Sequence, residues 1–193
     1  MTRPAPVPRL ETERLLLREW RDSDRAPYAA LNGDPEVMRH FPARLTPEQS
    51  SEMVDRITAN WRDRGFGLWA VERLDIGEFI GFVGLLAPIW EAEFTPCVEI
   101  GWRLAKEHWG QGFAPEAAMA VLEWGFANVD LPGDRILSFT TVGNTNSQRV
   151  MQKIGLIHDP ALDFDHPLLP DWKDRRHVVY RIDREQYDKR VAR

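Results

Sequence analysis

Residues 98–118 read VEIGWRLAKEHWGQGFAPEAA, and the chain is organised around this stretch. Its pattern predicts a strand, a short polar turn, a loop with two glycines and the start of a long helix. Glu99, Gly101 and Arg103 share one face of the strand, because side chains alternate across it. A carboxylate beside a glycine there is either part of a solvated face, an ion-pair partner of Arg103 or a functional group.

The predicted helix carries small and apolar residues at the spacing of a core-facing stripe. They are Ala114, Ala117, Ala118, Val121, Leu122, Gly125, Phe126 and Val129. Gly110 and Gly112 come just before the helix, where glycine permits backbone conformations that other residues avoid. Free N–H groups at a helix start, together with the helix dipole, attract phosphate. The loop is therefore either a phosphate site or a plain glycine turn into a helix.

Spacing argues against two other nucleotide-binding patterns. A Walker loop needs Gly-Lys followed by Ser or Thr, and the chain contains no Gly-Lys pair. A dinucleotide fingerprint needs an acid at the end of a second parallel strand. The acids at Asp130 and Asp134 fall in a predicted turn instead, so this interpretation is poor.

Length and composition favour one domain. The 193 residues carry a formal net charge of −5, which gives no attraction to nucleic acid. No apolar run approaches the ~20 residues of a membrane span. Cys97 is the only cysteine, which favours a reducing, cytoplasmic setting. We expect a flexible arm over residues 1–9, the domain over 10–183 and a charged tail over 184–193.

The remaining elements predict a mixed α/β domain. A helix begins at Thr46, where Pro47 and Gln49 complete a strong start signal, and it ends at Gly65. Further strands and one short helix are expected around it. The strands lie within residues 10–20, 66–74, 78–86, 135–142, 156–164 and 177–182, and the helix spans 147–154.

Several motifs together resemble one family. They are LETERLLLR at 10–18, EIGW at 99–102, HWGQGFAPEA at 108–117, NTNS at 144–147 and KIGL at 153–156. In order and spacing the chain is similar to the GNAT superfamily of acyl-coenzyme A-dependent N-acetyltransferases, and within it to the RimJ/RimL-like branch. The resemblance implies a single α/β domain with a splayed, mostly antiparallel sheet and helices on both faces.

The resemblance also implies acetyl-coenzyme A as co-substrate and an amine as acceptor. The backbone of Trp102, Arg103 and Leu104 would bond the pantetheine arm. Asn144 would reach the same arm, and Ser147 would lie near the thioester sulfur. The diphosphate would be held by the loop that contains Trp109, Gly110, Gln111, Gly112, Phe113 and Ala114.

The implied reaction is direct attack of the amine on the thioester. A base must take a proton, since free amines are mostly protonated at pH 7. Glu99 is the candidate base, and Ser147 is the candidate acid that protonates the leaving thiolate. Many family members use a tyrosine as the acid, but Met151 stands at that position here.

The acceptor pocket is expected between residues 36–45, 90–94 and 163–172. Phe41, Trp90 and His166 are its candidate substrate-binding residues, and a structural loop contact is the alternative for His166. His177 and Tyr180 are expected to pack or hydrogen-bond within the last strand, and Cys97 has no partner pattern of a nucleophile. His40, His108 and His158 lack metal-ligand spacing, so no metal is predicted.

Two function classes follow. The first is an acetyltransferase that acts on a primary amine such as a protein N-terminus, an amino acid, a polyamine or an amine-bearing antibiotic. The second is a non-catalytic acyl-coenzyme A-binding or regulatory module of the same fold. Neither class calls for nucleic acid or membrane, and a homodimer would be unsurprising in either.

Overall fold

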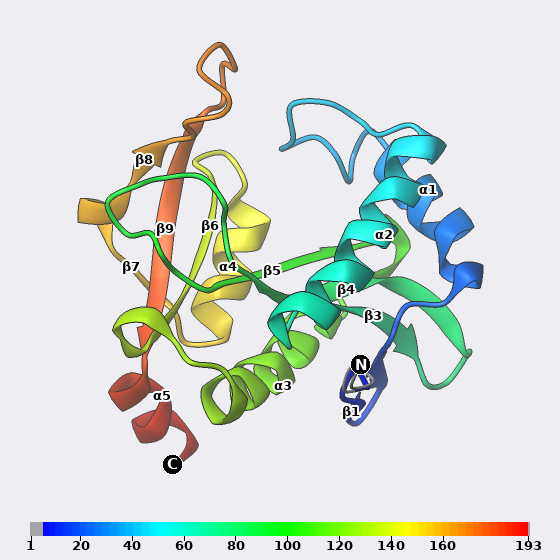
Figure 1. Ribbon diagram of the computed structural model, residues 1–193, viewed down its shortest axis with the longest axis horizontal. Coiled ribbons are helices and arrows are strands. Elements are labelled where there is room, and N and C mark those ends of the chain that lie inside the picture. Colours follow the sequence, from blue (N-terminus) through cyan, green and yellow to red (C-terminus); the bar gives the residue numbers. More distant parts are fainter. Residues whose placement is uncertain (1–5, 193) are drawn as a thin grey trace.

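The sheet runs in the order β1-β2-β3-β4-β5-β6-β9-β7, and β8 also pairs with β9 (Figure 1). The computed structural model describes residues 6–192. The strands are β1 (Leu10–Glu11), β2 (Leu15–Arg18), β3 (Leu68–Arg73), β4 (Glu78–Leu86), β5 (Glu99–Leu104), β6 (Arg135–Thr141), β7 (Ile157–His158), β8 (Phe164–Asp165) and β9 (Arg176–Asp183). The helices are α1 (Arg25–Gly33), α2 (Pro47–Arg64), α3 (Phe113–Asn128), α4 (Thr145–Lys153) and α5 (Arg184–Val191).

All strand pairs are antiparallel except β5 with β6. These two strands meet in parallel at the single pair Glu99 and Leu137, where the Leu137 N–H donates to the Val98 carbonyl over 2.9 Å. Beyond that pair the two strands diverge, so that β4 and β5 point in a different direction from β6 and β9 (Figure 1). The predicted splayed, mostly antiparallel sheet is confirmed.

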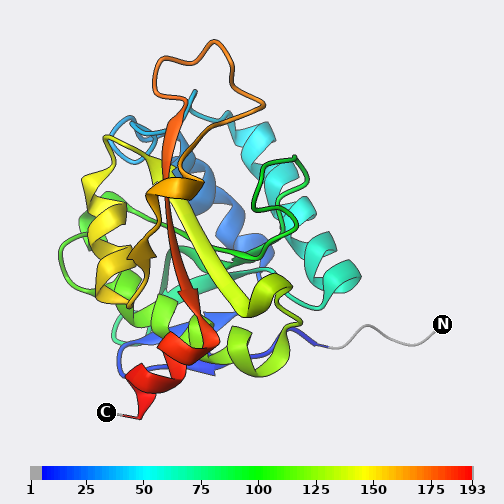
Figure 2. The same cartoon turned by 90° about the vertical axis from the view of Figure 1, so that its left-hand side faces the viewer.

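Helices cover both faces of the sheet. On one face α3 packs so closely on β4 that a Cβ on Gly125 would stand 2.9 Å from Leu85. On the other face α1 packs against α2 and β4. Along β6 and β9, α4 lies on one side and loop 87–98 on the other (Figure 2).

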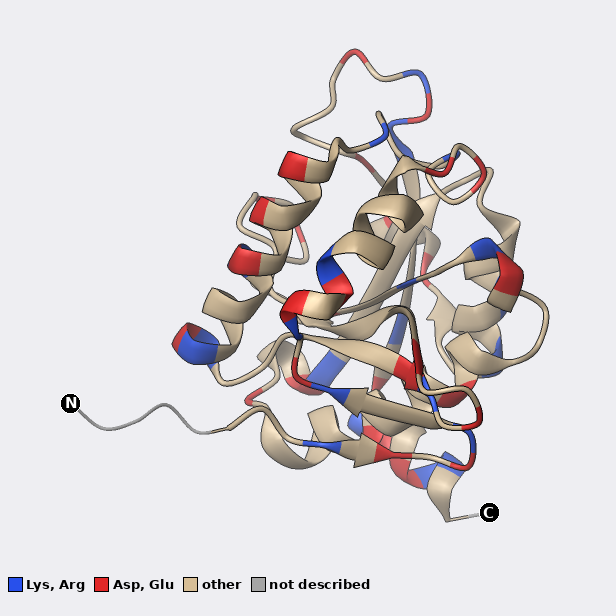
Figure 3. Cartoon of the chain, turned by 90° about the vertical axis from the view of Figure 1, so that its right-hand side faces the viewer, with Lys and Arg blue, Asp and Glu red and all other residues tan. Residues whose placement is uncertain are grey.

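The best-predicted helix is α2. The Thr46 side chain accepts from the Gln49 N–H, Gln49 bonds back to Thr46, and Gly65 ends the helix at a φ of 74°. Glu48 lies in its first turn and Arg62 and Arg64 lie in its last, which suits the helix dipole; Figure 3 marks these positions in red and blue on the ribbon. Among residues 6–192, no helix is both long and apolar enough to cross a membrane.

Three expectations about elements need correction. The strand expected within residues 10–20 is two strands, β1 and β2, because the chain turns between them. The strand expected over 156–164 survives only as β7 and β8; between them lies the 3₁₀ turn Pro160–Leu162, whose proline has no N–H to donate. The short helix begins at Thr145, with Asn144 as its cap.

Both ends of the described chain pack onto the domain. Residues 184–191, expected to be a charged tail, form α5, whose Tyr187 is buried against Phe126 with ring centroids 4.5 Å apart. Part of the expected arm is also held, since the Trp69 indole N–H donates to the Pro8 carbonyl over 2.7 Å. Residues 1–5 of that arm lie outside the described residues.

Candidate active site

The glycine loop presents a row of free backbone donors. Gly110 and Gly112 have φ values of 75° and 85°, in the left-handed region, and Gly112 is the cap residue of α3. Among the described residues, nothing accepts a hydrogen bond from the N–H groups of residues 110–114. No atom lies within 4 Å of the position of a Cβ on Gly110. Open donors at the positive end of a helix fit a diphosphate.

Ion pairs tie this loop to the first turn of the chain. The Arg14 guanidinium contacts the Glu116 carboxylate at 2.5 Å and donates to the Gln111 carbonyl at 2.9 Å. Thr12 donates to the same carboxylate at 2.6 Å, and the hydrogen bonds hold the pKa of Glu116 below its ordinary value against the opposing effect of burial. The LETER motif at residues 10–14 thus supports the loop through Thr12 and Arg14, a role that the sequence did not reveal.

The neighbouring edge of β5 is open beyond Glu99. The Ala105 N–H donates to the carbonyl of Ile80, which precedes Gly81 in β4. Backbone hydrogen-bonding groups of an antiparallel strand point alternately to its two sides, so those of Arg103 also point to β4. The backbone groups of Trp102 and Leu104 point the other way, towards the gap between β5 and β6. The Leu104 carbonyl accepts from the Trp109 indole at 2.8 Å, so Trp109 joins loop to strand. Of the three residues expected to offer backbone to the pantetheine arm, Trp102 and Leu104 face the gap.

Glu99 stands where β5 and β6 part. Burial raises the pKa of its carboxyl to about 8, although part of the side chain still reaches solvent. No described residue forms a hydrogen bond or ion pair with this carboxyl, so the expected alternative of an ion pair with Arg103 is wrong. Burial also raises the pKa of Cys97 to about 12, which keeps the thiol protonated and agrees with its expected inertness.

Asn144 and Ser147 lie at the start of α4. The Asn144 side chain accepts from the Ser147 N–H at 3.2 Å and donates to Thr140 at 2.9 Å, so both ends of its amide are engaged. The Ser147 hydroxyl makes no hydrogen bond to a described residue and is only partly buried. Met151 is 1 % exposed and belongs to the core, as its apolar side chain requires.

Aromatic rings from distant segments form a wall beside β9. Trp90 stacks on Phe164 at 5.3 Å and lies 5.1 Å from His166, so two of the expected acceptor loops do meet. His177 joins them, 5.4 Å from both Phe164 and His166, and was expected only to pack or hydrogen-bond. Burial lowers the pKa of both imidazoles, and the neighbouring His177 ring lowers that of His166 further.

Phe41 lies apart from this wall. Its ring covers the Arg103 guanidinium, whose central carbon is 4.1 Å from the ring centroid. In the same loop, His40 lies within 3.5 Å of the Thr141 hydroxyl, at the end of β6. Loop 34–46 therefore reaches from the β5 half of the sheet to the β6 half. Sequence alone pointed to Phe41 but not to His40, because the contact depends on loop placement.

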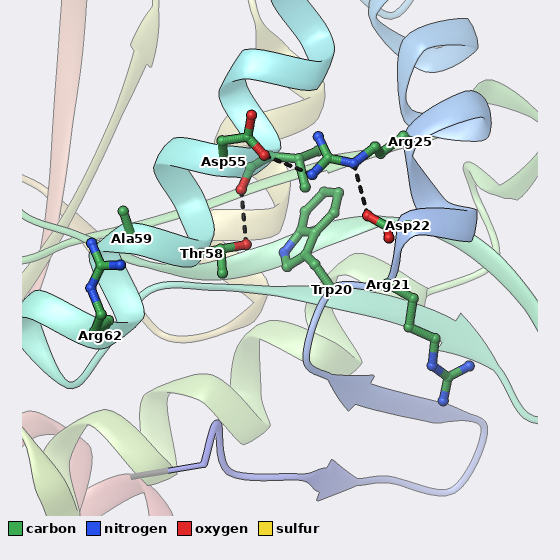
Figure 4. A pocket seen from close by; sticks show the side chains of 9 residues that line it. Trp20, Arg21, Asp22, Arg25, Asp55, Thr58, Ala59 and Arg62 are labelled. Carbon is green, nitrogen blue, oxygen red and sulfur yellow. Dashed lines mark hydrogen bonds and ion pairs between the residues drawn. The ribbon is translucent and has the colours of Figure 1, made fainter. Parts of the chain in front are cut away.

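Two cavities flank these elements. One, of about 390 Å³, lies between the loop at 91–94 and residues 161–167, and its lining includes Phe94 and Phe164. The other, of about 260 Å³, lies between α1 and α2 (Figure 4). Its central Arg25 is paired with Asp22 and Asp55, and no predicted site residue lines it. Residues 6–192 contain no cluster of three metal-ligating side chains.

The fold and the open loop together define an acyltransferase of the coenzyme A-dependent type. The family model of the acetyltransferase (GNAT) domain matches residues 14–157, and the chain belongs to this family. It is an N-acetyltransferase by family, with acetyl-coenzyme A as the co-substrate that the free loop N–H groups fit.

Individual relatives agree with this assignment. The chain is 34 % identical over 155 residues to the uncharacterized protein YkkB of Bacillus subtilis, covering 80 % of this chain and 88 % of YkkB. It is 30 % identical over 188 residues to the FsC-acetyl coenzyme A-N(2)-transacetylase of Aspergillus fumigatus, covering 93 % and 78 %. A solved acetyltransferase from Agrobacterium tumefaciens superposes with a TM-score of 0.74 at 27 % identity, covering 95 % and 99 %.

Proposed function

We propose that the protein transfers an acetyl group from acetyl-coenzyme A to a primary amine by direct attack, with Glu99 as general base. The observation that carries the proposal is the position of Glu99, a carboxyl without a partner at the point where β5 and β6 part. A general base works best when its pKa is near the operating pH, and a value of about 8 meets that condition.

The other residues of the site have separate tasks. The N–H groups of residues 110–114 hold the diphosphate, and the backbone of Trp102 together with the N–H of Leu104 orients the pantetheine arm. The Ser147 hydroxyl, which has no partner in the described chain, donates a proton to the leaving sulfur. Asn144 holds Ser147 through the cap of α4, so we propose for its side chain a positioning role.

The acceptor side uses the aromatic wall. Trp90 and His166 would contact the carbon skeleton of the amine, and Phe41 would close the opposite side. The proposal includes membership in the RimJ/RimL-like branch, which rests on the motifs at 10–18, 99–102 and 108–117. It also includes a cytoplasmic location. The protein is further proposed to form a homodimer, whose molar mass light scattering would detect.

Acceptor-dependent release of the coenzyme A thiol tests the proposal. The panel contains peptides with free N-termini, amino acids, polyamines and aminoglycosides. Release with at least one amine is expected, and Glu99→Gln and Ser147→Ala should each lower it. Glu123→Gln and Ser23→Ala, exposed positions away from the site, are the matched controls. If both site variants keep full turnover, these two assignments are wrong; binding of acetyl-coenzyme A without release under any amine would favour the non-catalytic module.

A further inference from the structure

Arg103 carries a charge that the described chain does not neutralise. Its Nη1 donates to the neutral Asn32 amide oxygen at 2.5 Å, and no described carboxylate pairs with it. Nε is buried without any partner, and Nη2 makes no hydrogen bond to a described residue. Buried charges in proteins are normally paired with an opposite charge, because an unpaired one loses its hydration without compensation.

The rings around Arg103 leave two guanidinium donors without a hydrogen-bond partner in the described chain, the buried Nε and Nη2. Phe41 lies 4.1 Å from the guanidinium carbon, and Phe82, the cross-strand neighbour, lies 5.4 Å from it. Ring faces stabilise a cation but accept no conventional hydrogen bond. The edge formed by Nε and Nη2 is thus unbonded, and the residue as a whole keeps partial solvent contact. Two parallel N–H donors on such an edge match a carboxylate.

Gly101 lies on the strand face between Arg103 and Glu99, so no side chain separates these two residues along β5. Both side chains lie on the same face of β5, about 13 Å apart along the strand at Cα. Outside residues 100–102, a Cβ placed on Gly101 would meet only Glu99 Oε1 within 4 Å. This face is the one covered by α1, whereas the diphosphate loop belongs to α3 on the opposite face. This face of β5 therefore has a proton acceptor at Glu99 and an unpaired guanidinium at Arg103.

We propose that Arg103 binds a carboxylate of the acceptor, so that the preferred substrates are amines that also bear a carboxylate, as amino acids do. This inference rests on the proposed function, since it takes the face of β5 beside Glu99 as the acceptor site. The Arg103 side chain sets specificity for the acceptor, and the amine is directed to Glu99 on the same face.

The first test needs only the natural protein and pairs of acceptors. Each pair consists of an amino acid and its primary amide. Their kcat/KM values are compared at pH values that give the same fraction of unprotonated amine. Amino acids with one to five carbons between the two groups vary the distance between amine and carboxylate. An ion pair to a charged group predicts a preference of roughly 10- to 100-fold for the acid in the best pair. Equal rates for acid and amide in every pair overturn the inference.

Variants then locate the preference. Arg103→Met should reduce the acid-to-amide ratio to near one, mainly through KM, and Arg103→Lys should retain part of it because the charge remains. Arg135→Met is the matched control, since Arg135 also has a buried Nε without a partner but lies at the start of β6. If Arg103→Met slows acids and amides alike, Arg103 only supports Phe41 and the inference fails.

These outcomes separate the two proposals. If no amine on the panel releases thiol, the proposed function fails. If amines react but the acid preference is absent, the function stands and only the role of Arg103 is lost. Melting temperatures of all variants identify a loss of folding, in which case the acid-to-amide comparison in the natural protein still decides.

Discussion

Glu99 Oε1 lies 3.9 Å from the position that a Cβ on Gly101 would occupy, and no other described atom outside residues 100–102 lies within 4 Å of that position. An alanine at position 101 would therefore fit without a clash and would cover the carboxyl further. Desolvation is what raises the pKa of Glu99, so deeper burial means a further rise.

Gly101→Ala should move the pH dependence of acetyl transfer to higher pH. We expect the midpoint of the alkaline rise in kcat to lie above that of the natural protein, with the melting temperature nearly unchanged. Gly33→Ala, at a position with nothing within 4 Å, is the control. A midpoint that stays in place or moves to lower pH would contradict the explanation by desolvation.

Glu99→Gln should remove the same pH dependence. In the natural protein the rate should rise with a midpoint near 8, as the carboxyl loses its proton. An acceptor whose amine titrates near ~10.4 keeps its own ionisation apart from this rise. Loss of a general base lowers kcat by roughly 10²- to 10⁴-fold. A variant that retains the rise near pH 8 would show that another group is titrated.

The same substitution should alter stability in a pH-dependent way. The pKa of Glu99 is higher in the folded protein than in the unfolded chain, so the folded state holds the proton more tightly. The contribution of Glu99 to the free energy of unfolding is therefore fully present below 4.5, the pKa of the carboxyl in the unfolded chain. This contribution is lost as the pH rises through the folded pKa of about 8.

Glu99→Gln has no such loss, so its melting temperature relative to the natural protein should be higher at pH 8.5 than at pH 5. A difference of about 1 kcal/mol corresponds to a shift of roughly 2–4 °C. Thermal unfolding at both pH values measures it, with Glu123→Gln as the control. An equal shift at the two pH values would mean that the carboxyl is well hydrated in the folded protein.

Gly112→Ala should damage the loop more than Gly33→Ala damages α1. Gly112 has a φ of 85°, and a Cβ there would stand 3.3 Å from Arg14 Nη2. A non-glycine residue in this conformation costs about 1–2 kcal/mol. We expect a lower melting temperature and a raised KM for acetyl-coenzyme A, measured by unfolding and by thiol release. An unchanged KM would argue against this loop as the diphosphate site.

Features that depend on nearby residues were predictable from the sequence. The cap of α2 at Thr46 and the glycine loop both follow from side chains within a few positions of each other. Asp24 shows the limit of such reasoning. It stands at the N-cap of α1, where an aspartate normally accepts from the helix backbone, but its side chain instead pairs with Arg18 at 2.7 Å.

The acceptor side was less accessible to sequence reasoning. His177 joins the aromatic wall only because β9 pairs with β6 in a register that sets His177 opposite Thr141. The sheet face on which Arg103 lies followed from strand alternation, whereas its partners Asn32 and Phe41 are 71 and 62 residues away in the sequence. Such contacts depend on topology, which a local pattern does not encode.

The single parallel pair between β5 and β6 has a consequence for hydrogen exchange. Past Glu99 and Leu137, no further residues of β5 and β6 are paired in the described chain, so the edge of β5 at Trp102 has no strand partner. A co-substrate that bonds to the free edge at Trp102 supplies the missing rungs of the ladder. Binding of the co-substrate then completes the sheet at this edge. Backbone amides of β5 should therefore exchange their hydrogens more slowly once the co-substrate is bound.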